Sequence, residues 1–321
     1  MSGVFICDLL RTPFGRPDGA LRLAGRDALK DSVRSALSER NGLRGKRLPV
    51  CGIEEWEQAL KSEEGACIVC EGAAGENATS PENWLEAAEA VAARWRIPRE
   101  MADIFAAESH EKALLAQRQG LLADEILTME ISGVAGGKET LERDELPRAD
   151  MSAESLRSFA PKRAGGTATE GNVPAAAIGA AAVLFSGEGF ARERGWRRLA
   201  RLTETATAED EPGLPGCGMI AAVERVTELA GVRRSDVGLW EVHELSAAHL
   251  LALVSELDLP FDRVNAWGGA IARGDPASAS AVQILGTLAR QMERYDVELG
   301  VAAFSAGGRG RAALLRRASR R

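Results

Sequence analysis

Residues 278–304 read SASAVQILGTLARQMERYDVELGVAAF and contain a helical segment followed by a β segment. The spacing of the apolar residues predicts a helix over Ser278–Glu293, and the apolar run after it predicts a strand over Val297–Phe304. A further strand is predicted at Ala312–Leu315. This part of the chain therefore has the helix and strand alternation of an α/β protein.

The same alternation extends from this stretch toward the N-terminus. Residues Ala175–Phe185 are small and apolar, and we predict a helix that turns into a buried strand ending at Ser186. Other strands are predicted at Val4–Leu10, Ala66–Cys70, Arg198–Thr205 and Val237–Val242. Other helices are predicted at Asp27–Arg40, Ile53–Leu60, 81–95, 98–120, 219–230 and Leu245–Leu257. The pattern predicts largely parallel sheets that are buried on both faces.

Composition excludes several classes of protein. The chain has 321 residues, 45% hydrophobic content and a net charge of −7, which argues against a general nucleic-acid binder. No apolar run reaches the roughly 18 residues that a membrane span needs. The N-terminus does not have the pattern of a secretory signal, and the number of cysteines is odd. We therefore expect a cytoplasmic protein that binds neither nucleic acid nor membranes.

Cys67 and Cys70 form a CxxC pattern inside the predicted strand Ala66–Cys70. Residues three apart on a strand point to opposite faces, so the two thiols should diverge. We therefore expect no metal site here.

Several motifs, in order along nearly the whole chain, resemble those of thiolases, especially the β-ketoadipyl-CoA type. VNAWGGAIARGDP at 264–276 stands where the family has VNVNGGAIALGHP, and EVHE at 241–244 stands where it has ELNE. The remaining matches are VFICDLLRTPFGR at 4–16, AAESHEKA at 106–113, GTATEGN at 166–172 and AAAVLF at 180–185.

The resemblance implies an α/β thiolase-like fold of two βαβαβαββ-type halves in five αβαβα layers, with an inserted helical and loop domain. Applied to this chain, it places a shortened N-terminal half at residues 1–75 and 174–190. The inserted domain would span residues 76–173, and the C-terminal half would span residues 191–321.

Thiolases cleave or form β-ketoacyl-CoA with a nucleophilic cysteine, a histidine that activates it and a second cysteine that moves protons. By resemblance, the histidine position holds Asp275, the second cysteine position holds Ser305, and the Asn of the NEAF motif is replaced by His243. Counting back from Gly72, the nucleophile position falls near Lys46. Cys51 lies about five residues too close to the next strand, so we expect it not to act as the nucleophile.

These replacements predict a thiolase-family protein without thiolase catalysis, serving as a partner or regulator. The alternative is an acyl-CoA-acting enzyme with altered chemistry, either a thioester hydrolase or a divergent acyltransferase. We predict no cofactor. A CoA thioester should bind weakly or not at all, because Pro174 occupies a position that contacts pantetheine in the family. Thiolases are oligomers, so we expect a homodimer or a hetero-oligomer with another thiolase-family subunit.

His243, Asp275 and Ser305 also have the identities of a Ser-His-Asp hydrolytic set. If the loops that carry them converge, Ser305 would attack a thioester, His243 would take its proton and Asp275 would fix the imidazole. The backbone N–H groups of Gly307 and Gly308 would face the oxyanion.

Overall fold

The computed structural model describes residues 3–43, 49–52, 65–73, 81–132 and 137–318. Lys46 and the predicted helix Ile53–Leu60 lie outside these residues. Within them, no helix is long and apolar enough to cross a membrane.

Eight strands form one sheet in the order β2-β3-β6-β1-β7-β10-β9-β8. Their bounds are β1 Val4–Arg11, β2 Val50–Cys51, β3 Ala66–Ala73, β6 Gly179–Gly187, β7 Ala200–Glu209, β8 Leu239–Val242, β9 Leu299–Ala306 and β10 Arg309–Arg317.

The prediction of a largely parallel sheet is wrong. Only β2–β3 and β8–β9 are parallel, while the five pairings between β3 and β9 in the sheet order are antiparallel. Strands β9 and β10 are joined by Gly307 and Gly308, which both have positive φ, so this two-residue hairpin requires antiparallel pairing. Apart from β2 and β7, the strands are nevertheless mostly buried on both faces, because helices cover the sheet from both sides.

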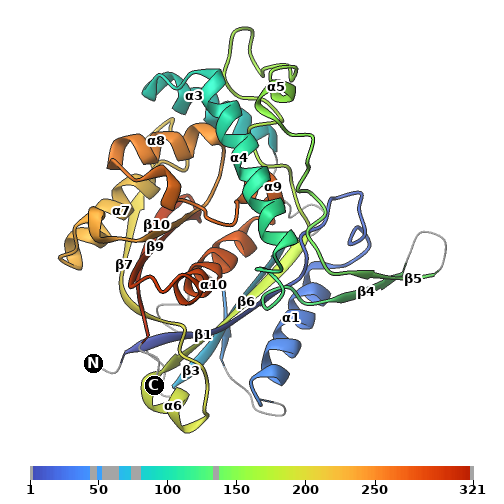
Figure 1. Ribbon diagram of the computed structural model, residues 1–321, viewed down its shortest axis with the longest axis vertical. Coiled ribbons are helices and arrows are strands. Elements are labelled where there is room, and N and C mark those ends of the chain that lie inside the picture. Colours follow the sequence, from blue (N-terminus) through green and yellow to red (C-terminus); the bar gives the residue numbers. More distant parts are fainter. Residues whose placement is uncertain (1–2, 44–48, 53–64, 74–80, 133–136, 319–321) are drawn as a thin grey trace.

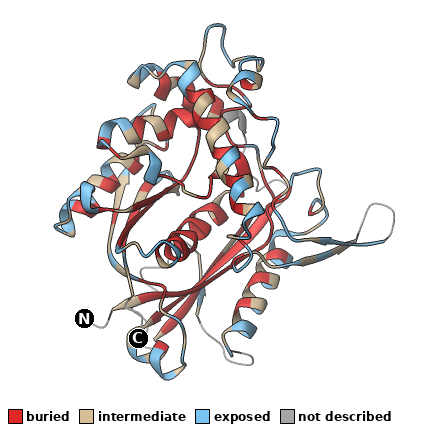
Figure 2. Ribbon diagram, in the orientation of Figure 1, coloured by how far each residue is buried: buried red, intermediate tan, exposed pale blue. Residues whose placement is uncertain are grey.

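Helix α10 (Ser278–Arg294) forms the central layer of the molecule and lies between the two parts of the sheet (Figure 1). Every residue from Ala279 to Met292 is buried, so the helix has no solvent face (Figure 2). Its residues share one core cluster with side chains from β1, β3 and β6 on one side and from β9 and β10 on the other.

The two outer layers are helices with one buried face each. Helix α1 (Arg26–Arg40) buries only Leu29, Val33 and Leu37, against β1, β3 and β6. Helix α7 (Gly218–Leu229) packs on the opposite side of the molecule, against β7, β9 and β10. Together with α10 and the two parts of the sheet, these helices give the five layers αβαβα.

Residues 81–173 lie across one end of these layers (Figure 1). They contain α3 (Pro81–Trp95), α4 (Arg99–Arg118), α5 (Ala153–Leu156) and the hairpin β4–β5 (Met129–Ser132 and Lys138–Leu141). This region is tied to β1 by the fully buried Arg11, whose guanidinium contacts Glu125 at 2.8 Å and Asp144 at 2.6 Å.

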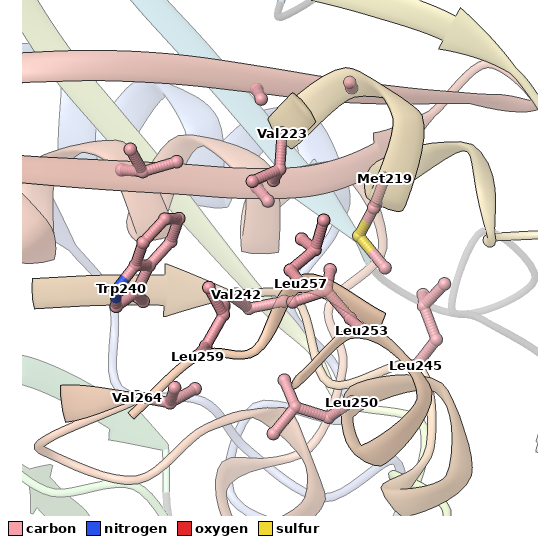
Figure 3. Packing of buried hydrophobic residues seen from close by; sticks show 14 of the residues in the cluster. Met219, Val223, Trp240, Val242, Leu245, Leu250, Leu253, Leu257, Leu259 and Val264 are labelled. Atoms are coloured by element: carbon pink, nitrogen blue, oxygen red, sulfur yellow. The ribbon is translucent and has the colours of Figure 1, made fainter. Parts of the chain in front are cut away.

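Strand β8 is fixed by an apolar cluster on its outer side. Figure 3 shows Trp240 and Val242 of β8 among Val223 and Met219 of α7 and leucines of α8 (Ala247–Leu257). This packing fixes the end of β8, from which the chain continues into residues 243–246.

Most predicted helices and strands are confirmed to within a few residues. The divergence of Cys67 and Cys70 is also confirmed, because Cys67 lies in the core beside α10 and Cys70 in the core beside α1. The predicted helix at the start of Ala175–Phe185 is wrong. Residues 175–178 instead form isolated bridges, including Ala176 to Asp275, before β6 begins at Gly179.

The close contact between α10 and β1 predicts an unusual response to a glycine substitution. A Cβ atom on Gly286 would lie 2.6 Å from Cβ of Leu9, so Gly286→Ala should lower the free energy of unfolding by about 1–2 kcal/mol despite the better helix propensity of alanine. At Gly189 in α6 (Glu188–Glu193), no atom lies within 4 Å of the added Cβ, so Gly189→Ala should be neutral or stabilise by up to about 1 kcal/mol. Urea unfolding measures both; stabilisation by Gly286→Ala would contradict the tight packing.

Candidate functional site

A pocket of about 700 Å³ opens at one end of the sheet, where strands from both of its parts end. His243 follows β8, Ser305 lies near the end of β9, and Glu71 lies near the end of β3. The described residues that line the pocket are Gly52, Glu71, Trp84, Asp210, Pro215, His243, Leu245, Asp275, Ala277, Ser278, Ser305, Ala306, Gly307 and Gly308.

The parallel pairing of β8 and β9 brings His243 and Ser305 to the same pocket. Val242 pairs with Ala303, and the His243 N–H donates to the Ala303 carbonyl at 2.8 Å. Ser305 lies two residues further along β9, opposite Gly310 of β10. The segments that carry His243 and Ser305 therefore meet at one pocket.

Asp275 reaches the pocket from the segment between α9 (Ala270–Arg273) and α10. Its backbone N–H donates to the Ala175 carbonyl at 2.8 Å, which fixes this segment next to residues 175–177. Its Oδ1 atom lies 3.2 Å from Nε2 of His243 and accepts a hydrogen bond from Ser280 Oγ at 2.7 Å. Both carboxylate and imidazole are buried, so the His243–Asp275 contact is shielded from water.

The buried carboxylate of Glu244 fixes the turn after His243. This carboxylate accepts hydrogen bonds from Ser109 Oγ at 2.8 Å, Asn265 Nδ2 at 2.8 Å and the Ile271 N–H at 2.9 Å. The Asn265 side chain also bonds both backbone groups of Val242. Hydrogen bonds therefore fix both neighbours of His243, Val242 before it and Glu244 after it.

The bonding of His243 leaves one of its ring nitrogens without a partner. An ionised Asp275 only accepts hydrogen bonds, so we assign the proton to Nε2, and in a neutral imidazole Nδ1 is then an acceptor. His243 Nδ1 is buried and has no hydrogen-bond partner among the described residues. Ser305 Oγ makes no hydrogen bond to it, so the His243–Asp275 pair is formed and the third contact of the predicted set is not.

Cys51 lies beside the pocket, but its thiol belongs to the core. It is the last residue of β2, and the next residue, Gly52, lines the pocket. The Cys51 side chain packs on the core beside α10, next to Cys67. Gly52, which follows the strand, therefore lines the pocket, whereas the Cys51 thiol faces the core.

The sequence-based prediction missed Glu71, Asp210 and Trp84, which come from three distant elements. The available signal was Glu71 itself, the one charged residue in the strand ACIVCEGA, Ala66–Ala73. The backbone conformation of Ala277 is a second indication of a functional site, and it comes from the structure rather than from the sequence. It lines the pocket with φ 52° and ψ −125°, a conformation that is strained for any residue with a Cβ.

No group of three or more His, Cys, Asp or Glu side chains in the described ranges is arranged to hold a metal ion.

Two segments of the chain match models of thiolase domains. Residues 81–189 match the model described as "Thiolase, N-terminal domain", and residues 196–317 match "Thiolase, C-terminal domain".

Two similar proteins are named as an acetyl-CoA acetyltransferase and a thiolase. The chain is 36% identical over 222 residues to an acetyl-CoA acetyltransferase of Allochromatium vinosum, covering 69% of this chain and 56% of that protein. It is 36% identical over 236 residues to the 3-oxoadipyl-CoA/3-oxo-5,6-dehydrosuberyl-CoA thiolase of Escherichia coli, covering 72% and 59%. The chain thus matches little more than half the length of these relatives.

Solved structures show the same fold. Human mitochondrial 3-ketoacyl-CoA thiolase superposes with a TM-score of 0.90 at 22% identity, covering 99% of both chains. The acetyl-CoA acetyltransferase of Bacillus anthracis superposes with a TM-score of 0.89 at 23% identity, again covering 99% of both chains.

The other two histidines are buried in a way that makes stability depend on pH. Burial lowers the pKa of His249 to about 4, and burial together with Arg148 lowers the pKa of His110 to about 4. A histidine whose pKa falls on folding adds stability above its unfolded value near 6.5, and this stability is lost as the pH falls toward 4.

We predict that His110→Asn reduces this pH dependence. Asparagine can still accept the hydrogen bond that the Arg148 N–H donates to His110 Nδ1 at 3.2 Å, but it does not titrate. As the pH falls from 6.5 to 4, the variant should gain stability relative to the wild type by about 1.4 kcal/mol per pH unit at most. Urea unfolding at several pH values tests this, and parallel curves for the two proteins would contradict it.

Proposed function

Because the chain belongs to the thiolase family, we propose that it is a thiolase homologue without thiolase catalysis that serves as a partner or regulatory subunit. One observation carries this proposal. Thiolase chemistry needs a thiolate at the site, and the described residues that line the pocket include none of the five cysteines.

The state of the thiols supports the same conclusion. Burial raises the pKa of Cys7, Cys70 and Cys217 to about 12, and the Cys51 contact together with burial raises the pKa of Cys67. These four thiols stay protonated at neutral pH, whereas a working nucleophile needs a lowered pKa. Cys51 faces Cys67 rather than the pocket.

The proposal extends to the organisation of the protein. We assign residues 1–75 and 174–190 to a shortened N-terminal half, residues 76–173 to an inserted domain and residues 191–321 to a C-terminal half. The order of strands supports this division, because β2, β3, β6 and β1 are neighbours in one part of the sheet and β7 to β10 in the other. We further propose a cytoplasmic homodimer, or a hetero-oligomer with another thiolase-family subunit.

The first test of the proposal is thiolysis. With acetoacetyl-CoA and CoA, the purified protein should turn over at least about 10⁴-fold more slowly than a typical enzyme rate of about 10 per second, because nucleophile, base and acid positions have all changed. The rate of turnover is measured by monitoring acetyl-CoA formation with chromatography. A turnover near one per second that Cys51→Ala abolishes would contradict the proposal.

The His243–Asp275 hydrogen bond favours a second candidate function, the hydrolysis of an acyl thioester. In this reaction Ser305 Oγ forms a bond to the thioester carbonyl carbon while its proton passes to His243 Nδ1. The carbon–sulfur bond then breaks, the thiolate leaves and takes that proton, and water releases the acyl group from Ser305. A substrate that brings Ser305 Oγ within about 3.2 Å of Nδ1 would complete the set.

This second candidate predicts a specific pattern of activity losses. If hydrolysis occurs, Ser305→Ala and His243→Gln should each reduce acyl-CoA hydrolysis by about 10³-fold or more. Ser278→Ala is the matched control, because it removes a hydroxyl from the same pocket outside the proposed set. Thiol release from acetyl-CoA measures the rate. Hydrolysis that is unchanged in Ser305→Ala would exclude Ser305 as the nucleophile.

A further inference from the structure

A second pocket, of about 520 Å³, lies far from the pocket that contains His243. Helix α10 starts at the His243 pocket with Ser278 and reaches the second pocket with Arg290, so the two residues are roughly 18 Å apart along the helix. Strand β7 begins just after Leu199, which lines the second pocket, and ends just before Asp210, which lines the first. The two pockets therefore lie at opposite ends of α10 and of β7.

A cluster of arginines lines this second pocket. Its described lining includes four arginines and two aspartates, Arg40, Arg194, Arg197, Arg290, Asp8 and Asp124. We propose that this arginine pocket binds the phosphate group of a small molecule. The inference goes beyond the proposed function and does not depend on it.

An irregularity of β1 opens the space that the arginines fill. The register of β1 against β6 shifts between Ile6 and Asp8, and the pairing of β1 with β7 ends at Ile6. Just beyond that point, the Leu9 carbonyl accepts hydrogen bonds from Arg40 Nη2 at 2.6 Å and from Arg290 Nη2 at 3.0 Å. Arginine side chains therefore take the place of a neighbouring strand beside this part of β1.

The guanidinium of Arg290 is buried and has donors without acceptors. Arg290 is 8% exposed, and its Nη2 atom makes all of its side-chain hydrogen bonds, to Asp8 Oδ1 at 2.8 Å and to the carbonyls of Leu9 and Asp124. Its Nε atom has no hydrogen-bond partner among the described residues, and its Nη1 atom comes only within 3.9 Å of Asp124 Oδ2. A guanidinium stays protonated and carries five N–H donors, so Nε and Nη1 require acceptors.

The buried carboxylate of Asp8 does not satisfy this guanidinium alone, because it is shared. It accepts hydrogen bonds from Arg40 Nη2 at 2.7 Å, from Arg290 Nη2 at 2.8 Å and from Asn41 Nδ2 at 2.8 Å. Burial lowers the pKa of Arg290 even though Asp8 raises it, so the carboxylate does not offset the lost hydration of the guanidinium. An anion in the pocket would supply the missing negative charge.

The other charged residues of the pocket leave an excess of positive charge. The Asp124 side chain is 83% exposed, so water screens its charge. Arg197 pairs with Glu293, whereas Arg194 lies over the ring of Phe190 and has no carboxylate partner in the described part of the chain. Arg194 is therefore a cation at the pocket that can bind an anion without first breaking an ion pair.

A phosphate group suits this arrangement. It carries about two negative charges near neutral pH and several acceptor oxygens, and guanidinium groups bind it through paired N–H donors. Trp196, Cys7 and Leu199 add apolar surface to the lining, and a volume of about 520 Å³ leaves room for a small organic group beside the phosphate. Inorganic phosphate and a phosphate ester share the chemistry that the pocket recognises.

Calorimetry with inorganic phosphate and with glycerol 3-phosphate tests the inference, with glycerol as the uncharged analogue. All titrations use the full chain at pH 7.5 and 0.15 M NaCl, which screens attraction to exposed charges. We expect one phosphate group per chain with a dissociation constant below about 1 mM, and at least tenfold weaker binding of glycerol. Tighter binding of the ester supports an organic phosphate as the ligand, and tighter binding of inorganic phosphate supports the free ion. Absent binding of both would overturn the inference.

Two neighbouring arginines locate the binding. Arg194 lines the pocket, whereas Arg192 pairs with Glu188 and is not part of the described lining. Arg194→Gln should weaken phosphate binding by at least about threefold, and Arg192→Gln, which removes the same charge, should leave it within about twofold. Equal losses in the two variants would assign the binding to general surface charge and overturn the inference.

Arg290→Lys tests the donors that lack acceptors. Lysine keeps the positive charge but removes the planar fork of N–H groups, so a folded variant should bind phosphate at least about tenfold more weakly. Circular dichroism of each variant measures folding, and unchanged affinity in folded Arg290→Lys would overturn the inference. If this variant does not fold, the comparison of Arg194→Gln with Arg192→Gln decides the question.

Discussion

Complete burial of α10 is the constraint on which the rest of the structure depends. A helix enclosed on all sides can carry polar side chains only where each finds a partner inside the protein. Ser280 bonds Asp275, Thr287 bonds Glu125, and the Gln291 amide donates to Glu241. These three partners come from different segments of the chain, so the central helix joins the pocket, the inserted region and β8 in one hydrogen-bonded framework.

This hydrogen-bonded framework makes the pocket rigid. Asp275 is held by its backbone next to Ala175 and by its side chain next to Ser280, and Glu244 fixes the turn after His243. A pocket that is preorganised in this way can hold ligands or support chemistry other than thiolysis. The thiolase fold alone therefore does not determine the function of this pocket.

The sequence was sufficient for the fold and for part of the pocket. Motifs along the chain, among them those at residues 241–244 and 264–276, predicted the thiolase fold, and His243, Asp275 and Ser305 do line one pocket. Strand direction was not predictable, because alternation of helices and strands does not specify which distant segments pair. Glu71 and Asp210 were missed for the same reason: each is an ordinary acidic residue locally, and only the positions of β3 and β7 in the sheet bring them to one cavity.

The position of β1 at the centre of the sheet has a consequence for biosynthesis. Its two neighbours, β6 and β7, begin at Gly179 and Ala200, so β1 is made long before either strand that pairs with it. At roughly 5–20 residues per second, the ribosome needs on the order of 10–30 s to reach β6. During that interval the apolar segment Val4–Arg11 lacks both of these partners, which makes the nascent chain a natural client for chaperones.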